Sequence, residues 1–292
     1  MLKEILFDSL FETIKIGGII LVLMVLVEYI EIKYNEKLKK FFSKGKSSQI
    51  VLSSLFGIFP GCIGTFVVDS FYMSGIIGFG AINSVLIATS GDEAFALISM
   101  AFSEGSKISI STVAFLFGTL FFLGIIGGYL AILYKKIFKI KLCEKCVIIH
   151  QDEDKYKKKP DTSHFFKEHI LNHIIKKHIS VLLIWLFFSI FFISALDTVF
   201  DMKNLLTHSK SLLLILGAFV GILPISGPNL LFVSLFSQGM IPFSVLLTNS
   251  IVQDGHGSLP LLSFSVNDTI KIKVFNILFG LLAGSILMVL GY

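Results

Sequence analysis

The chain has 292 residues, of which 54% are hydrophobic and 15% charged, and its mean hydropathy is +0.84. This composition is too apolar for a soluble domain of that length and predicts an integral membrane protein. The net charge of +5 comes from lysines that flank apolar segments, which excludes a nucleic-acid surface, and three cysteines are too few for a disulfide scaffold.

Eight apolar segments are long enough to cross a hydrocarbon core of about 30 Å. They lie near 14–32, 50–74, 76–102, 109–134, 178–199, 211–236, 240–264 and 273–291. We therefore expect an all-α, polytopic membrane protein. No small-residue cleavage site follows the first segment, so we expect a retained helix there and not a signal peptide.

A stretch of 36 residues occurs twice without a gap, 164 residues apart, as 57–92 and 221–256. The nine identical pairs are Gly57/Gly221, Ile58/Ile222, Pro60/Pro224, Ser70/Ser234, Gly75/Gly239, Ile77/Ile241, Phe79/Phe243, Ile87/Ile251 and Gly91/Gly255. Proline and glycine interrupt helices, and interrupted helices in apolar surroundings are typical of transporter binding sites. The alternative is an old duplication that persists only for packing.

The lysines predict the orientation of the two copies. Eighteen of the 25 lysines lie within 33–46 and 135–177, and the positive-inside rule makes both stretches cytoplasmic. We expect an extracellular N-terminus, a first membrane repeat at 1–134, a cytoplasmic linker at 135–177, and a second, inverted membrane repeat at 178–292. The scaffold is then an inverted-repeat helical bundle.

This orientation requires an interrupted helix in each half. Three apolar segments separate the two cytoplasmic stretches, and three full crossings cannot return the chain to the side that it left. One segment per half must therefore be split or re-entrant. We expect the breaks at Pro60 and Gly61 in the first half and at Pro224 and Pro228 in the second.

Ionisable side chains within these segments are the candidates for chemistry, because each costs about 2.5 to 3.5 kcal/mol at membrane depth. Asp92 aligns with His256 across the repeat, and inversion brings the two toward one midplane. The candidate transport residues at this position are Ser90, Asp92, Glu93, Gln253, Asp254 and His256.

Carboxylate, imidazole and amide groups in a helix gap suit a divalent first-row metal ion. Proton transfer is the competing use, since adjacent carboxylates repel and one can hold a proton. The purely structural alternative is that Asp92 or Asp254 caps the N-terminus of a half-helix.

The proline breaks add further candidates. Cys62 aligns with Ser226, and Asn229 occupies the position that corresponds to Thr65. A lone buried cysteine is usually a small apolar residue, but beside a broken helix it is also a candidate ligand. We include Cys62, Ser226 and Asn229 among the residues that line the transport path.

The linker carries its own cluster of metal-ligand types. Two cysteines three residues apart can hold a soft metal ion, and two histidines at i and i+4 share a helix face. The candidates for such a peripheral site are Cys143, Cys146, His150, His169 and His173. The alternative is a solvated basic linker.

Several of these motifs together resemble the ten-helix heavy-metal exporter family, whose members are described as arsenic efflux proteins or manganese transporters. The stretches that carry the resemblance are Gly57–Thr65, Ser74–Ile76, Thr89–Ala94 and Gly221–Asn229. The resemblance implies metal or metalloid export from a bacterial cytoplasm. Two departures stand out: Gly91 is an extra residue before the Asp-Glu pair, and Ser226 stands where the family commonly has cysteine, which weakens a trithiolate arsenite site.

We therefore expect a secondary-active exporter in the bacterial plasma membrane that carries a heavy metal, with a manganese-like divalent cation favoured. The metal is the transported substrate, and we expect no cofactor, no nucleic-acid partner and no ATP site. The nearest alternative is an arsenite permease of the same fold. A membrane-embedded enzyme is a minor alternative, because no zinc-protease or serine-lysine motif is apparent.

Overall fold

The computed structural model describes residues 3, 5–22, 25, 45–73, 75–103, 106–140, 142, 180–197 and 210–292. These residues form helices joined by short loops, and no strand occurs among them. The all-α expectation is confirmed. Most of the linker predicted at 135–177 lies outside the described residues, so the predicted domain boundaries stay predictions.

The first half begins with a helix at 5–22. It continues with α2 (Lys46–Gly57), α3 (Ile63–Met73), α4 (Phe79–Ala88), α5 (Glu93–Met100) and the long helix α6 (Ile110–Ile137). The second half contains α8 (Ser180–Asp197), α10 (Lys210–Gly221), the 3-10 turn η3 (Gly227–Asn229), α11 (Leu230–Ser237), α12 (Phe243–Val252), α13 (Leu259–Phe264) and α14 (Val266–Val289).

Four interruptions divide apolar segments of the described chain into half-helices. We call them break 1 (58–62), break 2 (89–92), break 3 (222–226) and break 4 (253–258). The membrane orientation expected from the lysines requires only one interrupted helix per half, so breaks 2 and 4 are additional to that expectation. A half-helix such as α2, with 12 residues, rises about 18 Å, so its break lies roughly halfway through a 30 Å hydrocarbon core.

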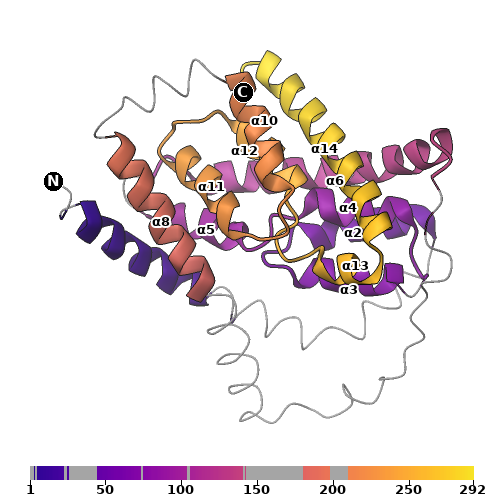
Figure 1. Ribbon diagram of the computed structural model, residues 1–292, viewed down its shortest axis with the longest axis horizontal. Coiled ribbons are helices and arrows are strands. Elements are labelled where there is room, and N and C mark those ends of the chain that lie inside the picture. Colours follow the sequence, from indigo (N-terminus) through magenta and orange to yellow (C-terminus); the bar gives the residue numbers. More distant parts are fainter. Residues whose placement is uncertain are drawn as a thin grey trace, which may run out of the picture.

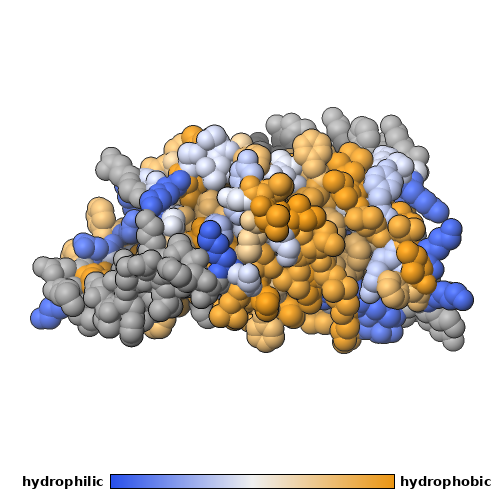
Figure 2. All heavy atoms as spheres, turned by 90° about the horizontal axis from the view of Figure 1, so that it is seen from above, coloured by the Kyte–Doolittle hydropathy of each residue, from blue (hydrophilic) through white to orange (hydrophobic). Residues whose placement is uncertain are grey.

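Three helical stretches of the described chain are long and apolar enough to cross a membrane: Phe79–Met100, which contains break 2, Ile110–Ile137 and Val266–Val289. Figure 2 shows an apolar surface across the middle of one face, with hydrophilic residues toward both ends. Large apolar side chains are exposed on α6 and α14, among them Phe115, Phe122, Leu278, Leu282 and Ile286. These outer faces suit contact with lipid.

The two halves have the same backbone at the 164-residue offset. The bounds of α2, of α3 and of α4 shift by 164 onto those of α10, of η3 with α11, and of α12. The glycines that adopt positive φ also coincide: Gly75 (70°) with Gly239 (69°), and Gly91 (53°) with Gly255 (52°). The sequence repeat is therefore a repeat of conformation, which a mere resemblance of composition would not produce.

Each half packs three helices into a bundle: α2, α4 and α6 in the first, and α10, α12 and α14 in the second (Figure 1). Glycines bring the backbones close. A Cβ at Gly128 would lie 2.9 Å from the Gly80 carbonyl oxygen, and one at Gly280 would lie 2.8 Å from Val252 Cγ2. Gly124/Gly280 and Gly128/Gly284 correspond at an offset of 156, because the loop before α14 is shorter than the loop before α6.

The two halves also contact each other through equivalent pairs of helices. Helix α5 contacts α11 from the other half, and α13 contacts α3 in return. The end of α11 accepts a hydrogen bond at Ser237 O from the Lys107 N–H (2.8 Å), while Tyr72 at the end of α3 donates to Asp268 Oδ2 (3.2 Å). Between the halves, the Gln253 amide donates to the carbonyl of Thr89, its own counterpart in the repeat (3.4 Å). Equivalent segments of the two halves are therefore in direct contact.

The helix at 5–22 and α8 lie side by side at the left edge of the molecule in Figure 1. A Cβ at Gly17 would meet the side chain of Leu183, and Ser99 of α5 donates a hydrogen bond to Ile16 O (3.0 Å). Helix α8 packs on α11. Both helices therefore lie at the α5 and α11 end.

Candidate functional site: a polar cluster at four helix breaks

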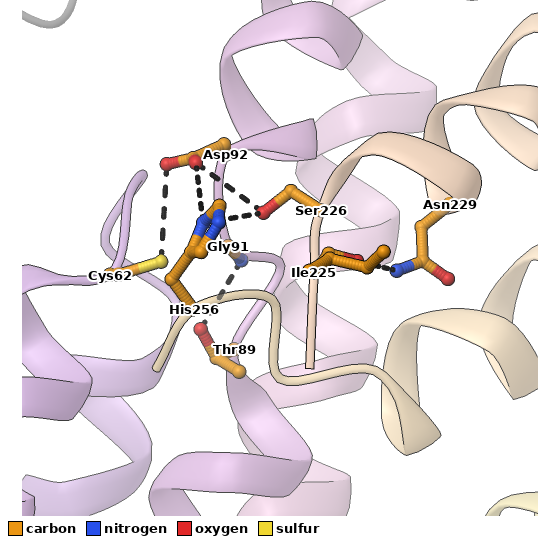
Figure 3. A network of polar contacts seen from close by, with 8 residues as sticks. All are labelled: Cys62, Thr89, Gly91, Asp92, Ile225, Ser226, Asn229 and His256. Atoms are coloured by element: carbon orange, nitrogen blue, oxygen red, sulfur yellow. Dashed lines mark hydrogen bonds and ion pairs between the residues drawn. The ribbon is translucent and has the colours of Figure 1, made fainter. Parts of the chain in front are cut away.

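One polar side chain from each of the four described breaks points into the same space (Figure 3). Cys62 comes from break 1, Asp92 from break 2, Ser226 from break 3 and His256 from break 4. We call these four residues the central cluster. Around Asp92, the Cys62 thiol lies 3.9 Å from Oδ1, and the Ser226 hydroxyl and His256 Nδ1 lie 3.3 and 3.6 Å from Oδ2.

The central cluster consists of two pairs of equivalent positions. Cys62 corresponds to Ser226, and Asp92 corresponds to His256, both at the 164-residue offset. Equivalent positions of the two copies of the repeat therefore meet in the cluster (Figure 3), while the residue types within each pair differ.

Local backbone explains why the helices stop at these places. Pro60 and Pro224 cannot donate the N–H that helix continuation needs, and Pro228 lies in the first positions of η3, which a proline tolerates. Break 2 has no proline, and Gly91 turns the chain there with φ 53°. The Gly61 N–H donates to Gly91 O (3.0 Å), so breaks 1 and 2 are joined directly.

Glycine is required at the centre for steric reasons. A Cβ at Gly255, whose φ is 52°, would lie 2.7 Å from Ser226 Oγ and 3.7 Å from Cys62 Sγ. A side chain at this position would therefore enter the cluster as well as strain the backbone.

Three members of the central cluster carry metal-ligand atoms. One donor atom from each of Cys62, Asp92 and His256 lies within 4.8 Å of the other two. Tetrahedral coordination with bonds of about 2.0 to 2.3 Å separates ligand atoms by about 3.3 to 3.8 Å, so the distances need only a small contraction. The Ser226 hydroxyl lies 3.5 Å from His256 Nδ1 and supplies a fourth donor atom, an oxygen, at the same place.

His256 is the most exposed member of the central cluster. The side chain of His256 keeps 29% of its exposure, whereas that of Asp92 keeps 5%. Cys62 and Ser226 are also buried. An ion that enters would meet the imidazole first and then the buried carboxylate and thiol.

Helix termini add a favourable field for these ligands. Helix α3 begins directly after Cys62, and α5 begins directly after Asp92. The N-terminal end of a helix carries partial positive charge, which stabilises a nearby anion. These helix ends would therefore stabilise the negative charge of ligands that hold a cation at this place.

The capping alternative does not describe these aspartates. Asp92 occupies the N-cap position of α5, but its side chain makes no capping hydrogen bond and turns toward the cluster instead. The N-cap of α13 is Ser258, and Asp254 precedes it by four residues.

Other predicted residues surround the cluster without joining it. Glu93 is buried beside Asn229, and neither of its carboxylate oxygens accepts a hydrogen bond of normal geometry from the described residues. Asn229 accepts from the Asn249 amide (2.8 Å). Ser90 is buried, and Gln253 is bonded to Thr89 O.

Asp254 is the predicted transport residue that lies elsewhere. Its Oδ2 is 2.7 Å from Lys273 Nζ, in a separate buried ion pair. Lys273 is not among the residues predicted from the sequence, because it stands at the start of the last apolar segment, where lysines commonly flank a membrane span. The available signal was its position between Ile272 and Val274, within a continuous apolar helix.

Two further buried polar residues near the cluster are not among the transport residues predicted from the sequence. Asn249 bridges Asn229 and Gly217 O, and Thr89 contacts Thr65 (3.4 Å) and the Gly91 N–H (3.2 Å). The peripheral candidates Cys143, Cys146, His150, His169 and His173 lie outside the described residues.

Comparison with known proteins gives a family. The sequence profile of a family described as "Putative, 10TM heavy-metal exporter" matches residues 3–188 and 136–290, which together span almost the whole chain. No curated protein and no solved structure matches the chain.

Proposed function

The chain belongs to the 10TM heavy-metal exporter family, and we propose that it is a secondary-active transporter that exports a divalent first-row metal ion from the cytoplasm. The observation that carries this proposal is the convergence of one polar side chain from each described break on one buried cluster. Broken helices that meet near the membrane midplane, at the interface of two repeats, are the recurrent binding-site design of secondary transporters.

The donor set favours particular ions. Thiolate and imidazole ligands suit zinc and its neighbours, whereas manganese prefers oxygen ligands. The manganese-like expectation rests on the family resemblance, and the presence of Cys62 and His256 beside Asp92 shifts the preference toward a softer divalent ion such as zinc.

Arsenite is the alternative cargo within the same family. A trithiolate site needs three cysteines, and Cys62 is the one cysteine in the part of the chain that the structure describes. Ser226 occupies the equivalent position with a hydroxyl. The cluster therefore favours a cation bound by mixed sulfur, nitrogen and oxygen ligands.

The proposed transport mechanism is alternating access of the central cluster to the two sides of the membrane. An inverted pair of repeats can expose one central site alternately to the two sides by rocking one half against the other. In this bundle the exchanged contacts of α5 with α11 and of α13 with α3 are the surfaces that would move.

The test compares the elemental content of bacterial cells that express the protein with that of cells that do not, during exposure to zinc, cobalt, manganese or arsenite. We expect the protein to lower the cellular content of at least one divalent metal. Asp92→Asn should abolish this effect because it removes the central carboxylate, and Cys62→Ser should weaken it, since serine keeps a donor oxygen.

Asp8→Asn is the matched control, because it neutralises an exposed carboxylate in the helix at 5–22. Its cells should have the metal content of wild-type cells. Lowering of arsenite content alone, abolished by Cys62→Ser and retained in Asp92→Asn, would contradict the proposal in favour of an arsenite permease.

A further inference from the structure

A second buried charge cluster lies away from the central cluster, around Lys273 in α14. The Lys273 side chain is 11% exposed, and its ammonium contacts three oxygens: Asp254 Oδ2 at 2.7 Å, Val252 O at 2.9 Å and Gly221 O at 3.2 Å. A charged lysine within an apolar helix is costly unless it is fully compensated and has a task.

The two carbonyls are the last of two half-helices. Gly221 ends α10 and Val252 ends α12. The C-terminal end of a helix carries partial negative charge, and its terminal carbonyls have no partner within the helix. Two such ends and one carboxylate form a site with the charge and the oxygen ligands that an inorganic cation requires. The ammonium of Lys273 fills that site.

The site occurs in one half of the repeat. At the 156-residue offset of α6 and α14, Lys273 corresponds to Phe117, and at the 164-residue offset Asp254 corresponds to Ser90. The first half thus has the same converging helix ends without the charges. If the fold alone required these charges, both halves would carry them. The lysine and its carboxylate therefore have a role that is specific to the second half.

A further buried carboxyl group comes from α3, which packs against α13 of the other half. Asp69 of α3 is fully buried, and neither of its oxygens accepts a hydrogen bond from the described residues. The position that corresponds to Asp69 in the second half is Val233, so this carboxyl group also occurs in one copy of the repeat alone.

We propose that Lys273 is a tethered cation that occupies an alkali-cation site formed by Asp254, Val252 O and Gly221 O. The site joins the helix ends that precede breaks 3 and 4, which carry Ser226 and His256. The tethered ammonium thus holds the second half of the central cluster together without a cation from solution. Its part in a transport cycle rests on the proposed function, whereas cation binding at this site does not.

The test measures thermal unfolding of the purified, full-length protein in detergent. Unfolding is followed in sodium chloride, potassium chloride or choline chloride at equal ionic strength. Lys273→Ala empties the site and leaves its three oxygens, so sodium or potassium should raise the unfolding temperature by about 3 °C or more over choline. The wild-type protein should unfold at the same temperature in all three salts.

Two variants control for other effects of the substitution. Lys271→Ala removes a neighbouring ammonium that pairs with Asp268 (3.9 Å) and should unfold at one temperature in all three salts. The double variant Asp254→Asn, Lys273→Met removes both charges together, so it should fold and lose the response to sodium and potassium. This response is independent of metal export, so failure of one proposal is distinguishable from failure of the other.

Three results would overturn the tethered-cation proposal. One is a folded Lys273→Ala protein that unfolds at the same temperature in all three salts. Another is an equal response to sodium or potassium in the double variant. The third is a Lys273→Ala protein that does not fold in any of the salts while the double variant does, since the vacated site would then accept no free cation.

Discussion

Gly255 shows how closely single residues control the central cluster. Gly255→Ala introduces a Cβ 2.7 Å from Ser226 Oγ and forces an L-residue to adopt φ 52°. The left-handed conformation alone costs about 1 to 2 kcal/mol. We expect the unfolding temperature to fall and the affinity for zinc in an equilibrium titration to decrease at least tenfold, because the alanine displaces Ser226.

Gly118→Ala is the control for this substitution. Gly118 lies within α6, and a Cβ there would have no neighbour within 4 Å. Alanine has a better helix propensity than glycine, so this variant should be as stable as the wild type or more stable, with unchanged zinc affinity. Wild-type zinc affinity in Gly255→Ala would contradict the placement of His256 and Ser226 in one site.

The sequence predicts every member of the central cluster, but it also predicts site residues that lie outside the cluster. The alignment of Asp92 with His256 and of Cys62 with Ser226 identifies all four members. The same reasoning adds Asp254, which the structure places against Lys273. Asp254 and His256 are two residues apart in a turn, and a turn can direct them to different partners. Sequence proximity does not contain that information.

At the scale of elements, breaks 1 and 3 follow from local chemistry. Proline removes a helical hydrogen bond wherever it occurs in a helix interior, so Pro60 and Pro224 are sufficient to predict these breaks from the sequence. Break 2 depends on tertiary contacts. The chain turns at Gly91, whose carbonyl accepts from Gly61 and whose neighbour Thr89 accepts from Gln253 of the other half.

The roles of the two lysines at the start of α14 also depend on tertiary contacts that the sequence does not reveal. Successive helical positions differ by about 100°, so Lys271 and Lys273 lie on different faces of α14. Lys273 Nζ reaches the carbonyl of Gly221 in α10, whereas Lys271 lies near Asp268 of its own helix. In the sequence, both lysines stand at the start of the last apolar segment, where a membrane-flanking role is expected of each. Only the packing of α14 against the ends of α10 and α12 distinguishes them.

At the scale of the whole molecule, the 164-residue repeat predicts a specific membrane orientation. Lys46 begins α2 and Lys210 begins α10 at the same offset, and both side chains are exposed. In a protein without its native cysteines, Lys46→Cys should react with a membrane-impermeant maleimide only from the cytoplasmic side. Lys210→Cys should react only from the extracellular side, as inverted repeats require.

The orientation of the repeats fails if both cysteines react from the same side of sealed cells and inverted vesicles. In that case the two halves would be parallel, and the exchanged contacts of α5 with α11 and of α13 with α3 would require another account. A permeant maleimide, which should label both positions in either preparation, confirms that each cysteine is reactive.

The most direct measurement of the central cluster is X-ray absorption of the zinc-loaded, purified protein carrying Cys143→Ser and Cys146→Ser. Cys62 is then the one cysteine left of the three in the sequence. We predict one sulfur at about 2.3 Å and nitrogen or oxygen ligands at about 2.0 to 2.2 Å, with the sulfur lost in Cys62→Ser and zinc binding lost in Asp92→Asn. Zinc bound without sulfur, or bound equally well in Asp92→Asn, would contradict a metal site at the four helix breaks.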